Sequence, residues 1–390
     1  MAEIRGYKNC RVVLPERIID KGFIRFDKGV ITSFGAMNDA GVDVLNGLDD
    51  ASGNLLLPGF IDIHCHGGAG ADVMDATDEA IRTLAAYHAA GGTTGFLATT
   101  TSEAQDDILK AIDVAKRNKN TPTGAQILGV HLEGPYFNLS KKGCHLDDQV
   151  RNPDKNEYAK FLETGFVRHM TLAPELPGAD DLISALVKNG ATASLGHSEA
   201  TYRQVVNAVK KGASHVTHMY CAMSGIIKNG YDRSGGMVEA TLLEDALTTE
   251  IIADGKHLPD ELIKLVVKAK GAGRVCVVTD AMRGAGMPDG TYTFGSLKGT
   301  KAIVKDGIAF TPDKSGMASS IYRMIDMFQH MTRVIGVDVV SASAMFSTNP
   351  AKIIHVDHLT GSIVRGKQAD VIVLDENFDL KKTVVKGIQI

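Results

Sequence analysis

The central part of the chain alternates short apolar runs with amphipathic stretches. Helical patterns fall between most of the runs, which occur at 60–66, 94–100, 126–132, 169–173, 192–197, 214–218, 250–254 and 275–280. The weakest helical pattern, near 237–245, lies between the sixth and seventh runs. Because strands that alternate with helices form parallel sheets, we expect each run to be a strand of one parallel sheet. Eight such strands predict an α/β fold, namely a (β/α)8 TIM-like barrel.

Two helices in this region have recognisable ends. Ser102-Glu103-Ala104-Gln105 has the form of a capping box and predicts an amphipathic helix that runs to about Arg117. Thr77-Asp78-Glu79 predicts the start of a second helix, which Gly91-Gly92 ends.

Both ends of the chain have the pattern of β structure. Short apolar or alternating runs occur at 11–14, 18–19, 23–26, 30–32, 369–374 and 383–385. Asp27-Lys28-Gly29 is typical of a hairpin turn. We therefore expect residues 1–52 and 355–390 to form one small β-sandwich domain beside a barrel over 53–354. The segment 291–312 interrupts the alternation as an inserted hairpin, and we expect it to join the small β domain.

Composition and charge narrow the class of protein. The 390 residues include 42 Lys+Arg and 46 Asp+Glu, a net charge of −4, and give no basic surface for nucleic acid. Apolar residues at 44% and charged residues at 23% exclude wholesale disorder. No apolar run reaches the roughly 18 residues of a membrane span, and the first residues lack the apolar core of a signal peptide. The 5 cysteines are scattered, so we expect a cytoplasmic protein with reduced thiols and no membrane partner.

Side chains of the kinds that bind metals stand at the ends of the predicted strands. They are His64, His66, Glu133, His197, His218 and Asp280. In a barrel the carboxyl ends of all strands converge on one mouth. Each residue alone has a structural alternative: a packed histidine, a solvated carboxylate, or a cap of the next element. Their joint placement favours a site for a divalent metal, with zinc or another first-row ion the best match to imidazole and carboxylate.

A metal held in this way implies hydrolysis. The ion polarises a carbonyl group and lowers the pKa of bound water towards ~7. A carboxylate must then take the proton of the water and return it to the leaving group, and Asp280 is the candidate for this acid/base role. The residues alone therefore predict metal-assisted hydrolysis of an amide-like or related bond.

Two histidines and one arginine are candidates for the substrate side of the mouth. His257 follows the seventh strand, and His145 lies in the long loop after the third. Arg233 stands in a glycine-rich stretch, where charge and backbone N–H groups can hold a phosphate. A surface arginine in a flexible loop is an equally good interpretation. Cys65 points away from its flanking histidines and is expected to pack, whereas Cys221 lies three residues past His218.

These motifs resemble a known superfamily. Residues 58–67, Pro-Gly-Phe-Ile-Asp-Ile-His-Cys-His-Gly, are similar to the first-strand signature of the amidohydrolases. A narrower resemblance, to the N-acetylglucosamine-6-phosphate deacetylase family, is carried by residues 131–136, 142–145, 195–198, 253–257 and 278–282. The resemblance runs in order from about residue 50 to 375.

The resemblance implies a barrel with a small β-sandwich, a homodimer, and hydrolysis of an acetamide. The expected products are glucosamine 6-phosphate and acetate. It implies that Glu133, His197 and His218 bind one metal, that His64 and His66 bind a second where two ions are present, and that Asp280 is the acid/base beside the metal. One or two ions, zinc or iron, are expected. His145 would contact the sugar or its carbonyl, Cys221 and Ala222 the substrate, and His257 and Arg233 the phosphate, within one chain or across the dimer.

Three stretches depart from the family pattern, all on the substrate side. Cys221 stands where the family has an asparagine that helps to bind phosphate, and a thiol cannot donate comparably. Arg233-Ser234-Gly235-Gly236 replaces Arg-Glu-Pro-Gly, and Met317-Ala318-Ser319-Ser320 replaces Leu-Ala-Gly-Ser. The leading hypothesis is a deacetylase of N-acetylglucosamine 6-phosphate. The alternative is an amidohydrolase of another N-acyl substrate, such as N-acetylgalactosamine 6-phosphate. A non-catalytic sensor is disfavoured because a binder needs no acid/base at Asp280.

Overall fold

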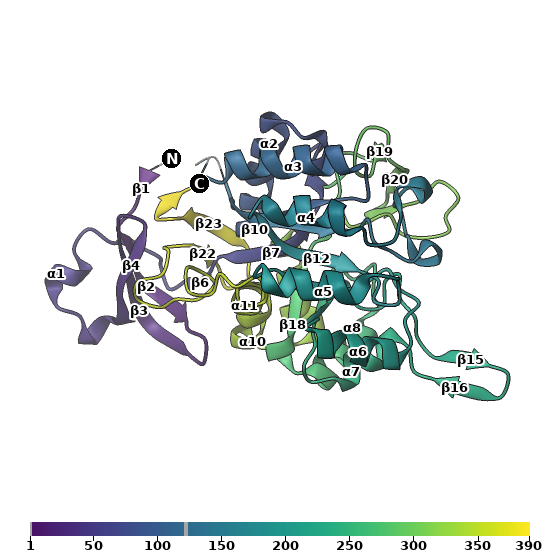
Figure 1. The fold of residues 1–390 in the computed structure, drawn as a ribbon. Helices are drawn as coiled ribbons and strands as arrows, with labels where there is room; N and C mark the ends of the chain where they lie inside the picture. The colour runs from purple at the N-terminus through teal and green to yellow at the C-terminus, as the bar shows by residue number, and fades with distance from the viewer. Residues whose placement is uncertain (1, 121–123) are drawn as a thin grey trace.

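The computed structural model describes residues 2–120 and 124–390, and its larger part is a parallel barrel (Figure 1). The sheet order β18-β17-β14-β13-β12-β11-β10-β7 follows the chain from its last barrel strand to its first. Its two edges meet through a parallel bridge between Cys65 and Ala281. The strands are β7 (Phe60–Cys65), β10 (Thr93–Thr100), β11 (Gln126–Glu133), β12 (Val167–Leu172), β13 (Thr192–Leu195), β14 (His215–Val216), β17 (Thr248–Ile252) and β18 (Val275–Val278). The predicted barrel and its strands are confirmed.

Helices surround the barrel and cover the outer faces of its strands. They are α2 (Asp78–Ala89), α3 (Gln105–Asn118), α4 (Lys155–Glu163), α5 (Ala179–Lys188), α6 (Tyr202–Lys211), α7 (Met237–Leu243), α8 (Asp260–Lys270), α9 (Met324–His330), α10 (Val339–Ser343) and α11 (Asn349–Ile353). The weak pattern near 237–245 is thus a real helix, α7. Each amphipathic helix buries its apolar stripe, as α3 does with Ile108, Ala111 and Ile112.

One predicted helix cap is confirmed and the other is wrong. The Thr77 side chain accepts a hydrogen bond from the Ala80 backbone N–H and begins α2 as predicted. Helix α3 begins at Gln105 with no side-chain cap. The Ser102 N–H instead donates to His145 Nδ1, and the Glu103 carboxylate accepts a hydrogen bond from Ser296. The Ser102 hydroxyl has no partner among the described residues, and the Gln105 side chain donates to Asp106 and accepts from Lys160, so the expected capping box does not form.

The two ends of the chain share one sheet. Its order is β1-β24-β23-β22-β6-β2-β3-β4, with β5 beside β2. The strands are β1 (Ala2–Glu3), β2 (Gly6–Val13), β3 (Ile18–Asp27), β4 (Val30–Ala36), β5 (Asp49–Asp50), β6 (Leu55–Pro58), β22 (Val371–Leu374), β23 (Leu380–Val385) and β24 (Ile388–Gln389), and a short helix, α1 (Val42–Leu45), follows β4. Apolar side chains from both ends form a second core, including Val12, Ile24, Leu56, Val371 and Val384. The domain boundaries at 52 and 355 stay a prediction.

The inserted segment 291–312 does not join the terminal sheet, contrary to expectation. Strands β19 (Gly290–Thr293), β20 (Lys301–Lys305) and β21 (Ile308–Phe310) form a sheet of their own. Figure 1 shows β19 and β20 at the end of the molecule away from the terminal strands. The apolar side chains of the insert pack on barrel loops: Phe294 and Val304 form a small core with Cys144 and Met282. Burial against those loops explains the placement.

Two further hairpins leave the barrel. Strands β8 (Gly67–Gly68) and β9 (Ala71–Asp72) pair directly after β7. Strands β15 (Ile227–Asn229) and β16 (Asp232–Ser234) form an arm that projects from the body in Figure 1, with Tyr231 at its turn 91% exposed. Among the helices of the described residues, none has both the length and the apolar character needed to cross a membrane.

Candidate active site

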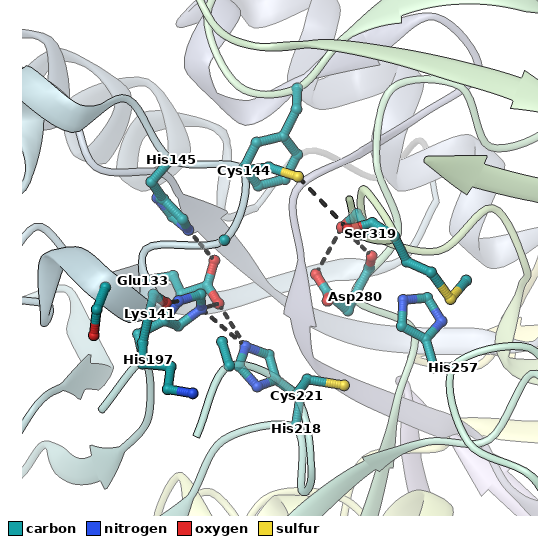
Figure 2. Close-up of a pocket in the computed structure, with 16 residues that line it drawn as sticks. Glu133, Lys141, Cys144, His145, His197, His218, Cys221, His257, Asp280 and Ser319 are labelled. Carbon is teal, nitrogen blue, oxygen red and sulfur yellow. Dashed lines mark hydrogen bonds and ion pairs between the residues drawn. The ribbon is translucent and has the colours of Figure 1, made fainter. Parts of the chain in front are cut away.

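The candidate metal ligands meet at the carboxyl ends of the barrel strands. Glu133 ends β11, and His197, His218 and Asp280 follow β13, β14 and β18 within two residues. They line a pocket of about 400 Å³, together with His145, Cys221, Ala222 and His257. Figure 2 shows the side chains of His145, His197 and His218 pointing toward that of Glu133. His64 and His66 lie fully buried behind this lining. A volume of this size suits a small-molecule ligand.

The backbone turns sharply where three of these side chains enter the pocket. His197, His218 and Asp280 have positive φ angles of 49°, 27° and 46°. Few residues other than glycine adopt such angles, and histidine and aspartate do so more readily than most. Strained backbone of this kind clusters at functional sites, where the surrounding structure holds it.

The Glu133 carboxylate joins two pairs of histidines. Its Oε1 atom lies 3.1 Å from His197 Nε2 and 3.0 Å from His218 Nε2. Its Oε2 atom lies 3.1 Å from His66 Nε2, and Oε1 lies 3.3 Å from His64 Nε2. Two groups that could hold a metal therefore share this carboxylate, His64–His66–Glu133 and Glu133–His197–His218.

Hydrogen bonds on the far side of two rings leave their inner nitrogens free for a metal. His197 Nδ1 donates to the Lys141 carbonyl at 2.7 Å, and His64 Nδ1 donates to Glu250 Oε2 at 3.0 Å. With a proton on Nδ1, each ring can present Nε2 as a lone pair once a metal displaces any proton that Nε2 carries.

The inner nitrogens also have the spacing of a metal site. The Nε2 atoms of His64 and His66 are 3.2 Å apart, and those of His197 and His218 are 3.1 Å apart. Tetrahedral ligands with bonds of about 2.0–2.2 Å are separated by about 3.3–3.6 Å, and a bound ion would need to widen these distances only slightly. The donor set therefore fits a divalent ion in either group.

The electrostatics of the cluster favour a cation. Burial alone would lower the pKa of His66, but the carboxylates of Asp280 and Glu133 raise it to about 9. Burial alone would raise the pKa of Glu133, but the charge of His64 and a hydrogen bond from His145 hold it well below its ordinary value. The buried carboxylates thus attract positive charge, which protons or a divalent ion can supply.

Asp280 is held in place by Ser319. The Ser319 hydroxyl lies 2.8 Å from Asp280 Oδ1 and 2.6 Å from its carbonyl oxygen. The same Oδ1 atom lies 3.3 Å from His66 Nε2, so Asp280 reaches the edge of the metal cluster. Burial raises the pKa of Asp280, but the charges of His64 and His66 outweigh it and lower the pKa to about 2. Oδ2 has no hydrogen-bond partner in the described part of the chain and is free to accept a proton.

His145 is fixed as a neutral hydrogen-bond donor. Its Nδ1 atom accepts the Ser102 backbone N–H at 3.0 Å, so the ring proton resides on Nε2. Nε2 donates to Glu133 Oε2 at 3.1 Å. Burial lowers the pKa of His145 to about 4, which keeps the ring uncharged near neutral pH.

Of the residues predicted for the substrate side, some line the pocket and one lies outside it. His257 enters the pocket with Nδ1 2.8 Å from Asp254 Oδ2, which leaves Nε2 unconstrained. Cys221 also lines the pocket, and burial raises the pKa of its thiol to about 12. Arg233 lies exposed on the β15–β16 arm and is not among the described residues that line the pocket of its own chain.

Several residues near the site were not identified from the sequence. Phe294, from the inserted sheet, lines the pocket with its ring 4.9 Å from that of His66. Phe137 stacks on His197 at 4.1 Å. Ser319 was visible as a departure from the family pattern, and Glu250 as a charge at the start of an apolar run. The two phenylalanines carried no signal beyond their hydrophobicity.

Comparisons with known proteins agree with this geometry. A family model described as the Amidohydrolase family matches residues 55–389. The N-acetylglucosamine-6-phosphate deacetylase of Bacillus subtilis strain 168 is 32% identical over 99% of this chain and 97% of its own length. The N-acetylgalactosamine-6-phosphate deacetylase of Escherichia coli O157:H7 is 33% identical over 97% of this chain and 97% of its own.

The fold is also similar to that of solved structures. A mutant N-acetyl-D-glucosamine-6-phosphate deacetylase from Mycobacterium smegmatis, solved in complex with N-acetyl-D-glucosamine 6-phosphate, superposes with a TM-score of 0.91. That chain is 27% identical, and the match covers 100% of this chain and 99% of the other.

Proposed function

Because the chain belongs to the amidohydrolase family, we propose that it hydrolyses the acetamide of N-acetylglucosamine 6-phosphate to glucosamine 6-phosphate and acetate. The observation that carries the proposal is the arrangement around Glu133: two histidine pairs share its carboxylate, and Asp280 lies beside them at the pocket. Relatives that bear the name of this activity support the choice of substrate.

The residues of the chain divide the work of hydrolysis. A divalent ion, when bound, supplies a Lewis acid and an acidified water. Asp280 takes a proton from the attacking water at its free Oδ2 atom. The water oxygen bonds to the acetyl carbon, the C–N bond breaks, and Asp280 returns the proton to the amine nitrogen. The His145 Nε2–H, which donates to Glu133 Oε2 in this structure, would donate instead to the carbonyl oxygen of bound substrate, where negative charge develops.

We extend the proposal to the metal. Glu133, His197 and His218 would hold one ion, and His64 and His66 a second that shares Glu133. Imidazole and carboxylate ligands suit zinc or iron. The five cysteines are free thiols, which supports a place in the reducing cytoplasm.

The proposal also includes a homodimer. Arg233 stands on the exposed β15–β16 arm, away from its own pocket, whereas His257 lies within it. An arm that reaches a second copy would bring Arg233 to the phosphate end of the partner's pocket. Mixing Arg233→Ala chains with Asp280→Asn chains tests this, because only the mixed dimer has one intact pocket. Mixed samples that regain no activity would exclude the shared site.

The first experiment measures acetate release and metal content on one preparation. We expect turnover of N-acetylglucosamine 6-phosphate well above that of the unphosphorylated sugar. The N-acetylgalactosamine and N-acetylmannosamine 6-phosphates serve as matched epimers. Faster turnover of the galacto epimer would replace the substrate and keep the reaction. No acetate from any of them, with metal bound, would overturn the proposal.

A further inference from the structure

A second carboxylate lies fully buried behind the metal cluster. Glu250, in the middle of β17, is 0% exposed. Its Oε2 atom accepts the His64 Nδ1–H at 3.0 Å and the His218 backbone N–H at 3.2 Å. One carboxylate oxygen therefore contacts a member of each of the two groups that share Glu133.

The other oxygen of Glu250 has no comparable partner. Oε1 lies 3.4 Å from His215 Nε2 and 3.9 Å from His169 Nε2, and it accepts no hydrogen bond within the described residues. A buried carboxylate is costly unless donors satisfy it. The donors that do so here are His64 and His218, so the placement of this charge is explained by those two residues.

We propose that Glu250 is a positioning residue for both metal positions, acting through the His64 ring and the His218 backbone. The inference rests on the metal-dependent function proposed above. The hydrogen bond to Nδ1 fixes the His64 ring so that Nε2 faces Glu133, 3.3 Å away. The bond to the His218 N–H holds a residue whose φ is 27°, at the turn that brings its ring to the pocket. Partners of this kind typically change metal affinity by about 10–100-fold.

Three Glu250 variants test whether metal binding depends on the hydrogen bonds that the side chain makes rather than on its size or charge. Glu250→Leu removes both hydrogen bonds, and Glu250→Asp keeps the charge but withdraws the carboxylate by one methylene. We expect each to weaken metal binding by about 10–100-fold at both positions. Glu250→Gln keeps an oxygen of the same reach, with its amide N–H groups facing the free nitrogens of His169 and His215. The metal affinity of Glu250→Gln should decrease by less than about tenfold.

The control is a buried carboxylate far from the metal groups. Asp370, directly before β22 and 4% exposed, accepts hydrogen bonds from Gln126, Thr360 and the Lys386 N–H. Asp370→Leu should lower the melting temperature and leave metal affinity unchanged.

Metal affinity is measured by competition of zinc with a chelator, with melting temperature followed in parallel. Wild-type affinity in Glu250→Asp, or an equal loss in Asp370→Leu, would overturn the proposal. Loss at one position only would also overturn it. Because the readout is metal binding, it stays valid if the wild-type protein binds zinc but releases no acetate. That result would overturn the proposed substrate alone.

Discussion

The floor and the wall of the pocket are built differently. The floor comes from strand ends and consists of His64, His66, Glu133, His197 and His218. Hydrogen bonds on the far side lock the rings of His64 and His197. The substrate wall, Cys221, Ala222 and His257, comes from loops, and Arg233 stands outside on an arm. The barrel imposes the floor, whereas the wall depends on how separate loops pack.

Among the changes to the floor, we expect the largest effect from Glu133→Gln. The carboxylate is shared by both histidine pairs, so its loss should release metal from both positions. Without the ion, the Lewis acid and the acidified water are both lost, so acetate release should fall by more than the roughly 10⁴-fold upper limit for a single acid/base group, with metal content measured on the same sample. Asp254→Asn, which disturbs only the support of His257 on the wall, should keep its metal and raise KM. Full metal content in Glu133→Gln would contradict the shared-ligand arrangement.

The next largest effect is expected from Asp280→Asn, where the floor meets the reacting bond. An amide cannot accept the proton of water, so kcat should fall by about 10²–10⁴-fold. The Glu133–His197–His218 group does not include Asp280, so metal should stay bound there and KM should change little. Steady-state kinetics separates these quantities. A rise in KM that accounts for the whole loss would instead assign Asp280 to substrate binding.

The floor should also respond to pH. In the metal-free protein the pKa of His66 is raised to about 9 by Asp280 and Glu133, against the effect of burial. Below pH 9 a metal must displace that proton, so affinity should rise about tenfold per pH unit up to about 9 and flatten above it. Titration calorimetry in buffers of different ionisation enthalpy counts the released protons. The informative range is pH 6.5 to 8.5, between the ordinary histidine pKa of about 6.5 and the raised value. A metal affinity that stays constant over this range would contradict the assignment.

The sequence is more informative about the floor than about the wall for a geometric reason. Strand period and the convergence of strand ends are enough to place His64, Glu133 and Asp280 together. The left-handed turns at His197 and His218, which aim their rings, leave no mark in the residue pattern. They depend on tertiary contacts such as the bond from His218 N–H to Glu250.

The inserted sheet is a second case in which the residue pattern does not reveal a tertiary contact. Its strands could be read from alternation and its turn, but not the surface on which they pack. We expected the insert to join the terminal domain, since the insert and that domain both have the pattern of β structure. Burial of Phe294 and Val304 against Cys144 and Met282 placed the insert at the pocket instead. Likewise, the hydroxyl of Ser102 suggested a helix cap, while its N–H in fact orients His145.

Ser319 lies where floor and wall meet. Its φ of 68° suits glycine, yet its hydroxyl bonds to Asp280 Oδ1. Ser319→Gly should therefore lower kcat by about tenfold, because hydrogen bonds to charged groups contribute about 1.5 kcal/mol or more. The melting temperature should stay equal or rise, since glycine adopts this backbone without strain. Ser319→Ala, which keeps the strain and lacks the hydroxyl, should lose the same activity and be less stable. Equal kcat in all three proteins would exclude a role for the hydroxyl.

The smallest effect is expected on the wall, from Cys221→Asn. The thiol has its pKa raised to about 12 by burial and donates weakly, whereas an amide supplies two N–H groups at the same place. If the wall binds phosphate there, one added neutral hydrogen bond of about 1 kcal/mol should lower KM for the sugar phosphate by about fivefold. The unphosphorylated sugar should show no change, and metal content should equal that of the wild type. A decrease in KM for both sugars would mean that Cys221 contacts the sugar ring, and an increase for both would mean that its packing, not its hydrogen bonding, shapes the wall.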